Sequence, residues 1–199
     1  VPISKMRTLV EERTGANAAN KFFKLNPYVA DIPDTFSKEI NGVKLLVMGT
    51  VDVGGSGCVC PEHVMLKAIL SALTYRKNDV VIMDMEAGLE HLGRGTAANM
   101  DQFIVVIEPG ARSVQTYHNV KRLAKDLGIT RVRVVANKIR DDGDEEFISA
   151  IPAEDLLGFI HYNPDIIDAD RQGKSPYDFS PAAIEEIRKI KAILDRDES

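Results

Sequence analysis

Five short apolar runs, rich in valine and isoleucine, alternate along the chain with segments of helical character. Each run is nearly continuous in its apolar residues, which is typical of strands that are buried on both faces of a sheet. Strands that alternate with helices build a mostly parallel sheet with helices on both faces. The sequence therefore predicts an α/β fold with strands over residues 44–51, 80–84, 103–108, 132–137 and 156–161.

The segments between these runs carry helix signals at their ends. Pro61 suits the first turn of one helix, Gly128 suits a helix C-terminus, and Ser180 followed by Pro181 suits the start of the last helix. We expect one domain over 1–199, with an irregular N-terminal segment (1–43), a sheet core (44–162) and C-terminal helices (163–199). The predicted helices span residues 4–13, 61–74, 87–100, 113–127, 144–150 and 181–195.

The composition narrows the class of protein. A hydrophobic fraction of 44% and a charged fraction of 28% are ordinary for a globular domain of 199 residues. The net charge of −5 argues against a nucleic-acid groove, and no apolar stretch reaches the ~20 residues of a membrane span. Cysteine is scarce and no signal peptide opens the chain, so we expect a cytoplasmic protein without nucleic-acid or membrane partners.

The two cysteines of the chain, Cys58 and Cys60, stand in one C-x-C motif after a glycine-rich run. A tetrahedral thiolate site needs four sulfur ligands, and one chain offers two. We therefore expect a metal, Ni²⁺ or Zn²⁺, to be shared by two copies across a homodimer interface. The alternatives are a pair of inert reduced thiols or a redox pair. His63 is a possible extra ligand, although a solvated helix residue is the simpler interpretation.

Polar residues follow three of the apolar runs, where an open parallel sheet binds its ligands. Asp84, with Gly88 beyond it, has the form of a switch in which a carboxylate holds Mg²⁺ and a glycine lets the backbone follow a γ-phosphate. Asn137 can pair with the edge of a purine while the stem of Lys138 packs on its ring. Each pattern alone is also common in strand ends without function. The third pair of candidates is Glu108 and Pro109.

The sequence contains no phosphate-binding loop of the form G-x-x-x-x-G-K-[ST]. Gly173-Lys174-Ser175 is its nearest approach, but Asp168 stands where the first glycine belongs and no strand is expected before it. We also expect Pro176 to prevent a helix from following closely. This segment is therefore not interpreted as a phosphate site.

In combination, these motifs resemble one family. The C-x-C motif, the stretch Met83-Asp84-Met85-Glu86-Ala87-Gly88-Leu89-Glu90-His91, Glu108-Pro109 and Asn137-Lys138 occur in the order found in CooC-type accessory ATPases. These proteins mature nickel carbon monoxide dehydrogenase and belong to the MinD/ParA group of deviant P-loop ATPases. The resemblance covers roughly residues 44–177 and implies a P-loop NTPase fold.

The resemblance also implies a function. It makes the chain an ATP-dependent metallochaperone that inserts nickel into apo carbon monoxide dehydrogenase (CO dehydrogenase/acetyl-CoA synthase), with ATP/ADP and Mg²⁺ as cofactors. Asp84 would be the catalytic switch carboxylate facing Mg²⁺, and Cys58 and Cys60 would bind metal across the homodimer. Nucleotide contacts would come from Gly88, Asn137 and Lys138, with Glu108, Pro109 and the loop after residues 160–163 flanking the base.

The sequence departs from the family pattern in two ways. The family's first strand, its P-loop and a second strand come before the matched region, so we expect ATPase activity in the complete polypeptide and none in these 199 residues alone. Glu86 occupies a position that usually holds a small residue in this branch. His91 falls within a family motif, and packing against a strand is the alternative to a chemical role for it. The alternative functions are a non-catalytic interaction module and a partition or septum-site ATPase.

Overall fold

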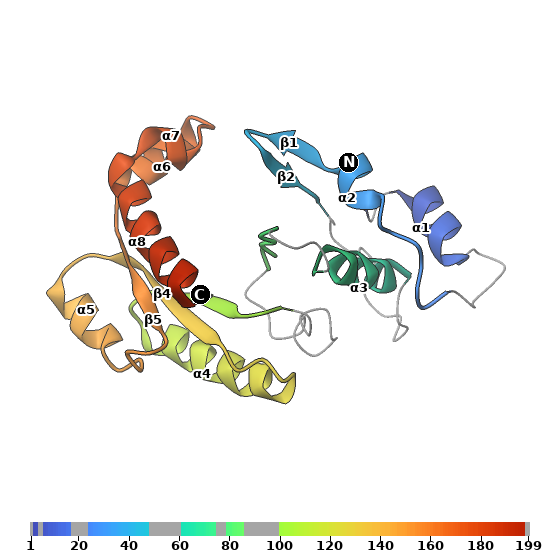
Figure 1. Ribbon diagram of the computed structural model, residues 1–199. Helices are drawn as coiled ribbons and strands as arrows, with labels where there is room; N and C mark the ends of the chain where they lie inside the picture. The colour runs from blue at the N-terminus through green and yellow to red at the C-terminus, as the bar shows by residue number, and fades with distance from the viewer. Residues whose placement is uncertain are drawn as a thin grey trace. The chain divides into compact units, whose positions relative to one another are not determined.

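The computed structural model describes residues 2–3, 6–16, 24–47, 61–74, 79–85 and 100–197 (Figure 1). The chain divides into two compact units, Val1–Asn99 and Met100–Ser199. Each unit has a hydrophobic core cluster of its own. The single-domain organisation stays a prediction.

The core of the first unit lies between two helices, α1 (Arg7–Thr14) and α3 (Pro61–Thr74). Both lie where the sequence predicted helices, and α3 begins at Pro61 as expected. A short helix, α2 (Ile32–Phe36), was not predicted. It adds the fully buried Ile32 to the core. The buried side chains of this cluster are Ile3, Val10, Val29, Ile32, Met65 and Ile69.

The predicted strand 44–51 is wrong in its pairing. Its first residues belong to β2 (Val43–Leu45), which pairs antiparallel with β1 (Lys38–Ile40) in a hairpin. Residues 48–51 lie outside the described residues. The turn is Asn41-Gly42, with φ of 51° and 80°, the positive values that a two-residue hairpin turn requires. An Asn-Gly dipeptide is a local signal for a hairpin, and the prediction relied on the apolar run instead.

The predicted strand 80–84 is also not formed. Residues 79–85 have no strand, and Val80 and Ile82 are 86% and 87% exposed. An apolar run becomes a strand only when its backbone pairs with a neighbour, and no described strand pairs with this one. The predicted helix 87–100 lies almost wholly outside the described residues.

The second unit is built on a parallel sheet in the order β3-β4-β5 (Figure 1). The strands are β3 (Phe103–Ile107), β4 (Val132–Ile139) and β5 (Leu156–His161), at the three predicted positions. Helix α4 (Ala111–Asp126) packs on β3 and β4, while α8 (Pro181–Asp197) packs on β5. The predicted α/β class, a parallel sheet with helices on both faces, is confirmed.

The remaining helices of this unit follow local capping signals. Helix α5 (Asp142–Ile148) is capped by Asp141, whose side chain accepts from the Asp144 N–H. Two helices were not predicted: α6 (Pro164–Arg171), capped by Asn163, and α7 (Pro176–Phe179), capped by Ser175. The expectation that Pro176 prevents a helix is wrong, because proline is well suited to the first helical position.

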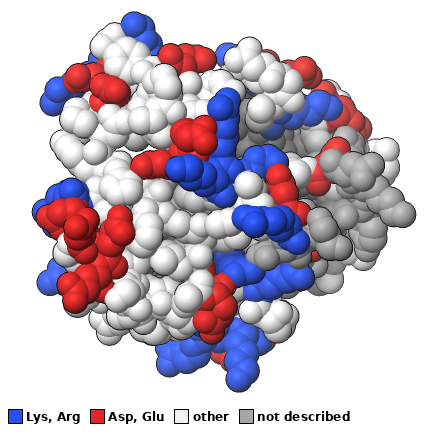
Figure 2. Space-filling view, turned by 60° about the vertical axis from the view of Figure 1, so that its left-hand side comes forward, with Lys and Arg blue, Asp and Glu red and all other residues white. Residues whose placement is uncertain are grey.

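Helix α8 covers the sheet through close contact with β5. A Cβ on Gly158 would lie 3.2 Å from Ile190 Cγ1, so a glycine lets this helix approach the strand. Within the part of the chain that the structure describes, no helix is long and apolar enough to cross a membrane. On the face drawn in Figure 2, acidic and basic side chains lie side by side.

A polar cluster of Tyr117, Lys121 and Asp155 ties α4 to the loop before β5. The side chain of Tyr117 is fully buried and its hydroxyl donates to the Asp155 carboxylate, as does Lys121 Nζ. Burial pushes the pKa of Asp155 up, but the hydrogen bonds from Lys121 and Tyr117 outweigh it and hold that pKa below its usual range. The same contacts with Asp155 raise the pKa of Lys121.

We predict that Asp155→Asn lowers the free energy of unfolding at pH 7 by about 1–3 kcal/mol, because it weakens two charge-assisted hydrogen bonds in a buried cluster. A lowered folded-state pKa means that this stability is present above the ordinary aspartate pKa of about 3.9 and is lost as the pH falls through the folded value. Urea unfolding followed by circular dichroism should therefore show wild type and variant converging at low pH.

The matched control is Asp168→Asn, which removes an exposed carboxylate paired with Arg171. It should change the unfolding free energy by less than about 0.5 kcal/mol. A difference between wild type and Asp155→Asn that is constant with pH would contradict the assigned role.

Candidate functional site

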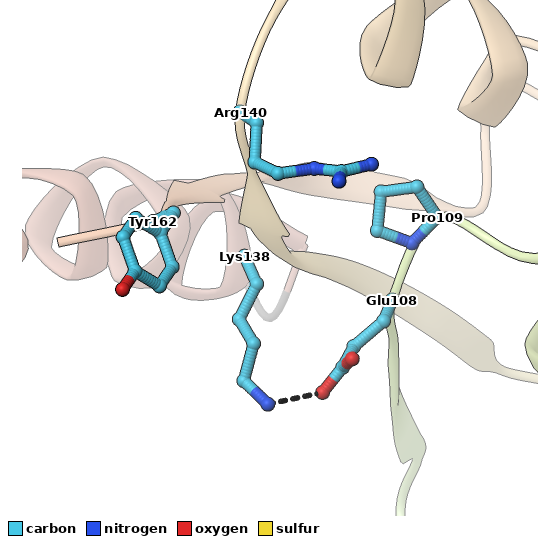
Figure 3. A pocket seen from close by; sticks show the side chains of 5 residues that line it. All are labelled: Glu108, Pro109, Lys138, Arg140 and Tyr162. Atoms are coloured by element: carbon cyan, nitrogen blue, oxygen red, sulfur yellow. Dashed lines mark ion pairs between the residues drawn. The ribbon is translucent and has the colours of Figure 1, made fainter. Parts of the chain in front are cut away.

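A pocket of about 270 Å³ lies where β3, β4 and β5 end. Its wall comes from the segment after β3, from the end of β4 and from the residue after β5. Parallel strands end at the same edge of a sheet, so these distant parts of the chain meet there. The residues that line the pocket are Glu108, Pro109, Lys138, Arg140 and Tyr162 (Figure 3).

The end of β4 is distorted at Lys138. Its φ is 60°, in the left-handed region that side chains other than glycine rarely adopt, and the pairing with β5 shifts register between Asn137 and Ile139. Asn137 Oδ1 accepts from the Lys138 N–H at 3.0 Å and supports this conformation. Left-handed backbone at a residue of this size costs on the order of 1 kcal/mol and is often found at functional sites.

The long cationic side chains of Lys138, near the end of β4, and Arg140, just after it, diverge from this point (Figure 3). Lys138 reaches toward Glu108, with Nζ 2.5 Å from Oε1, while Arg140 extends toward Pro109. Arg140 donates from Nε and Nη2 to the two carboxylate oxygens of Asp144, at 2.8 and 2.9 Å. This pairing raises the pKa of Arg140 and lowers that of Asp144.

The charges around the pocket cancel. Lys138 is paired with Glu108 and Arg140 with Asp144, so two cations face two carboxylates. A site for phosphate alone would present an excess of positive charge. Each cation of this pocket wall is instead already paired with a carboxylate.

Tyr162 is positioned by the end of β5. Its N–H donates to the Ile139 carbonyl at 2.8 Å, and its neighbour His161 is held by Glu186 of α8. Glu186 accepts from the His161 backbone N–H at 3.0 Å and lies 2.8 Å from Nδ1, while Glu145 lies 3.3 Å from Nε2. The contact with Glu186 raises the pKa of His161, with a smaller effect from Glu145.

The comparisons with known proteins give the family. No protein-family model matches the sequence. The carbon monoxide dehydrogenase accessory protein CooC of Rhodospirillum rubrum is 45% identical over 196 residues, which are 98% of this chain and 74% of that protein. The chain belongs to the CooC-type family of carbon monoxide dehydrogenase accessory proteins. Its α/β sheet is consistent with the P-loop ATPase fold expected for this family.

Two further relatives of this CooC-type chain come from Methanocaldococcus jannaschii. One uncharacterized ATP-binding protein is 43% identical over 196 residues, covering 96% of this chain and 76% of its own length. A second is 27% identical over 189 residues, covering 95% of this chain and 73% of its own length.

In this CooC-type chain the structure brings together three of the predicted site residues, Glu108, Pro109 and Lys138. Asn137 lies at the same strand end without lining the pocket. Asp84 is exposed in the stretch 79–85. Gly88, Cys58 and Cys60 lie outside the described residues, as do Glu86 and His91, and the side chain of His63 is not described.

Arg140 was not predicted as a pocket residue, and Tyr162 entered the prediction only within the stretch 160–163 that precedes a loop expected to flank the base. Arg140 and Asp144 have the i, i+4 spacing of an ion pair, which was the available signal for that wall. Tyr162 directly follows a predicted strand but carries no charge that would mark it. Among the described residues, no group of three histidine, cysteine, aspartate or glutamate side chains could hold a metal ion.

We predict that the pKa of His161 lies above the ordinary histidine value of about 6.5 and that Glu186→Gln lowers it. A raised folded-state pKa means that the contact contributes stability below that ordinary value and loses it as the pH rises through the folded pKa. Titration of the imidazole carbon resonances by NMR, assigned with His161→Gln, measures this directly.

The matched control is Glu185→Gln, one residue away on α8, which pairs with Arg188. It should leave the pKa of His161 unchanged. Equal effects of both substitutions would show that the general charge of α8, rather than the Glu186 contact, sets the pKa.

Proposed function

We propose that this chain binds ATP and acts as a metallochaperone that delivers nickel during the maturation of carbon monoxide dehydrogenase. The observation that carries the proposal is the pocket at the carboxyl ends of β3, β4 and β5, where each of the two cations is paired with a carboxylate. Family membership supports it, because the relatives are named as a carbon monoxide dehydrogenase accessory protein and as ATP-binding proteins.

In this proposal the pocket holds the adenine base. Its planar groups would cover the faces of the ring, while Glu108 and Lys138 offer an acceptor and a donor to its edge. Asn137 lies beside them, and its Nδ2 is a further donor. The phosphates would be held elsewhere, with Gly88 among their contacts, since Lys138 and Arg140 are each paired with a carboxylate.

The catalytic role falls to Asp84. A carboxylate is a suitable oxygen ligand for Mg²⁺, which bridges the phosphates and neutralises their charge. Asp84 is exposed and would be oriented by bound nucleotide and metal. We propose that the protein hydrolyses ATP and that Asp84 is its switch carboxylate.

We predict that Asp84→Asn in the complete polypeptide leaves ATP binding in place and slows hydrolysis about tenfold or more, because the carboxylate orders Mg²⁺ and the attacking water. Phosphate release at saturating ATP measures the rate, and isothermal titration measures binding. The matched control is Asp79→Asn in the same described stretch, which should hydrolyse ATP at the wild-type rate. An Asp84→Asn rate within a factor of two of wild type would assign this residue a structural role.

The metal would be held by Cys58 and Cys60. Two sulfur ligands per chain make a four-thiolate site only when two chains meet, so the proposal includes a homodimer with one Ni²⁺ or Zn²⁺ between its subunits. ATP would favour one arrangement of the dimer. The change between arrangements would decide whether the metal is held or is released to apo carbon monoxide dehydrogenase.

We predict about one metal ion per dimer, and its loss in the double variant Cys58→Ser/Cys60→Ser, because a structural site of this type needs four thiolates. Metal analysis combined with analytical ultracentrifugation gives the stoichiometry. His63→Ala is the control and should keep the metal. One ion retained per monomer in the double variant would contradict the shared site and direct attention to His63.

A further inference from the structure

Arg140 is held unusually firmly for a side chain that is 67% exposed. It makes three hydrogen bonds to one carboxylate: its backbone N–H, Nε and Nη2 donate to Asp144 at 3.0, 2.8 and 2.9 Å. Asp144 is itself 8% exposed and is fixed in the first turn of α5, where its N–H donates to Asp141 Oδ1 at 3.0 Å. The guanidinium group is therefore oriented by two hydrogen bonds to a carboxylate that is itself held in place.

The pairing with Asp144 leaves the flat faces of the guanidinium available. It uses one edge of the group, Nε and Nη2, and it neutralises the charge. Figure 3 shows the group extending across one side of the pocket toward Pro109, away from the Lys138–Glu108 pair. Arginine in this state is a weaker partner for phosphate, because Asp144 neutralises its charge and uses its Nε–Nη2 edge, which leaves only the Nη1–Nη2 end for an anion.

A fixed, neutralised guanidinium plane is well suited to stack on a heteroaromatic ring. Arginine stacks on flat π systems in proteins, and bases of every kind offer such a face. Because Asp144 has already ordered the side chain, binding costs little additional rotamer entropy. Lysine at the same position would offer a point charge and no plane.

We propose that Arg140 is a base-stacking residue of this pocket and that Asp144 is the positioning residue that holds its guanidinium plane. The inference rests on the proposed function, since it concerns the contact that the pocket makes with a nucleotide base. It adds to that function the two side chains that determine the affinity for the base as distinct from the phosphates.

The test compares ligands with and without a base on the complete polypeptide. ATP, CTP and inorganic tripolyphosphate are titrated, each with Mg²⁺, by isothermal titration calorimetry. Arg140→Ala should weaken ATP roughly 5- to 100-fold, the range for loss of one base-stacking contact, weaken CTP less, and leave tripolyphosphate within about a factor of two. Arg171→Ala, which removes an exposed arginine paired with Asp168, is the matched control and should leave all three affinities unchanged.

Two further variants, Arg140→Lys and Asp144→Asn, separate the effect of the guanidinium plane from the effect of its charge. Arg140→Lys retains the charge and a contact with Asp144 and is the variant to use if Arg140→Ala does not fold by circular dichroism. It should lose most of the ATP affinity that alanine loses. Asp144→Asn keeps an acceptor in the first turn of α5 but frees the guanidinium, so it should weaken ATP several-fold without weakening tripolyphosphate.

The outcomes distinguish the stacking role of Arg140 from the assignment of the pocket to a nucleotide base. Wild-type affinity for ATP in Arg140→Ala or Arg140→Lys would overturn the stacking role, and an equal loss of ATP and tripolyphosphate would show that Arg140 acts as a charge. A wild-type protein that does not prefer ATP over tripolyphosphate would instead overturn the assignment of the pocket to a base.

Discussion

The parallel pairing of β4 with both of its neighbours is the contact on which the second unit depends. Residues Val134 and Ala136 of this strand are fully buried, and its backbone pairs with β3 on one side and β5 on the other. Because all three strands run the same way, their carboxyl ends share one edge, and the pocket exists only there. The sheet therefore stabilises the unit and places the pocket residues at the same time.

The sequence predicted the elements whose signals are local or whose partners follow soon after in the chain. Pro61 marked the start of α3, Gly128 followed the end of α4, and the three strands of the second unit lie at their predicted positions. The runs 44–51 and 80–84 were wrong because an apolar run indicates burial and does not say which strand lies beside it. Asn41-Gly42 carried the correct local signal for the hairpin.

The pocket was predictable in outline for the same reason. Glu108 and Pro109 follow β3 and Lys138 lies at the end of β4, and the topology rule brings such residues together. Arg140 follows a register shift and a positive φ at Lys138, a backbone distortion that the sequence pattern does not predict. The roles proposed for Asp84, Cys58 and Cys60 come from the resemblance to the family, because Cys58 and Cys60 lie outside the described residues and Asp84 is exposed.

Helix α8 connects the end of the chain to the pocket. Its Ile190 packs against Gly158 in the middle of β5, and its Glu186 holds the backbone of His161, the residue before Tyr162. Removal of this helix would uncover one face of the sheet and also release the strand end that positions a pocket wall. C-terminal truncations of this protein therefore report on ligand affinity as well as on folding, and an affinity tag is better separated from α8 by a linker.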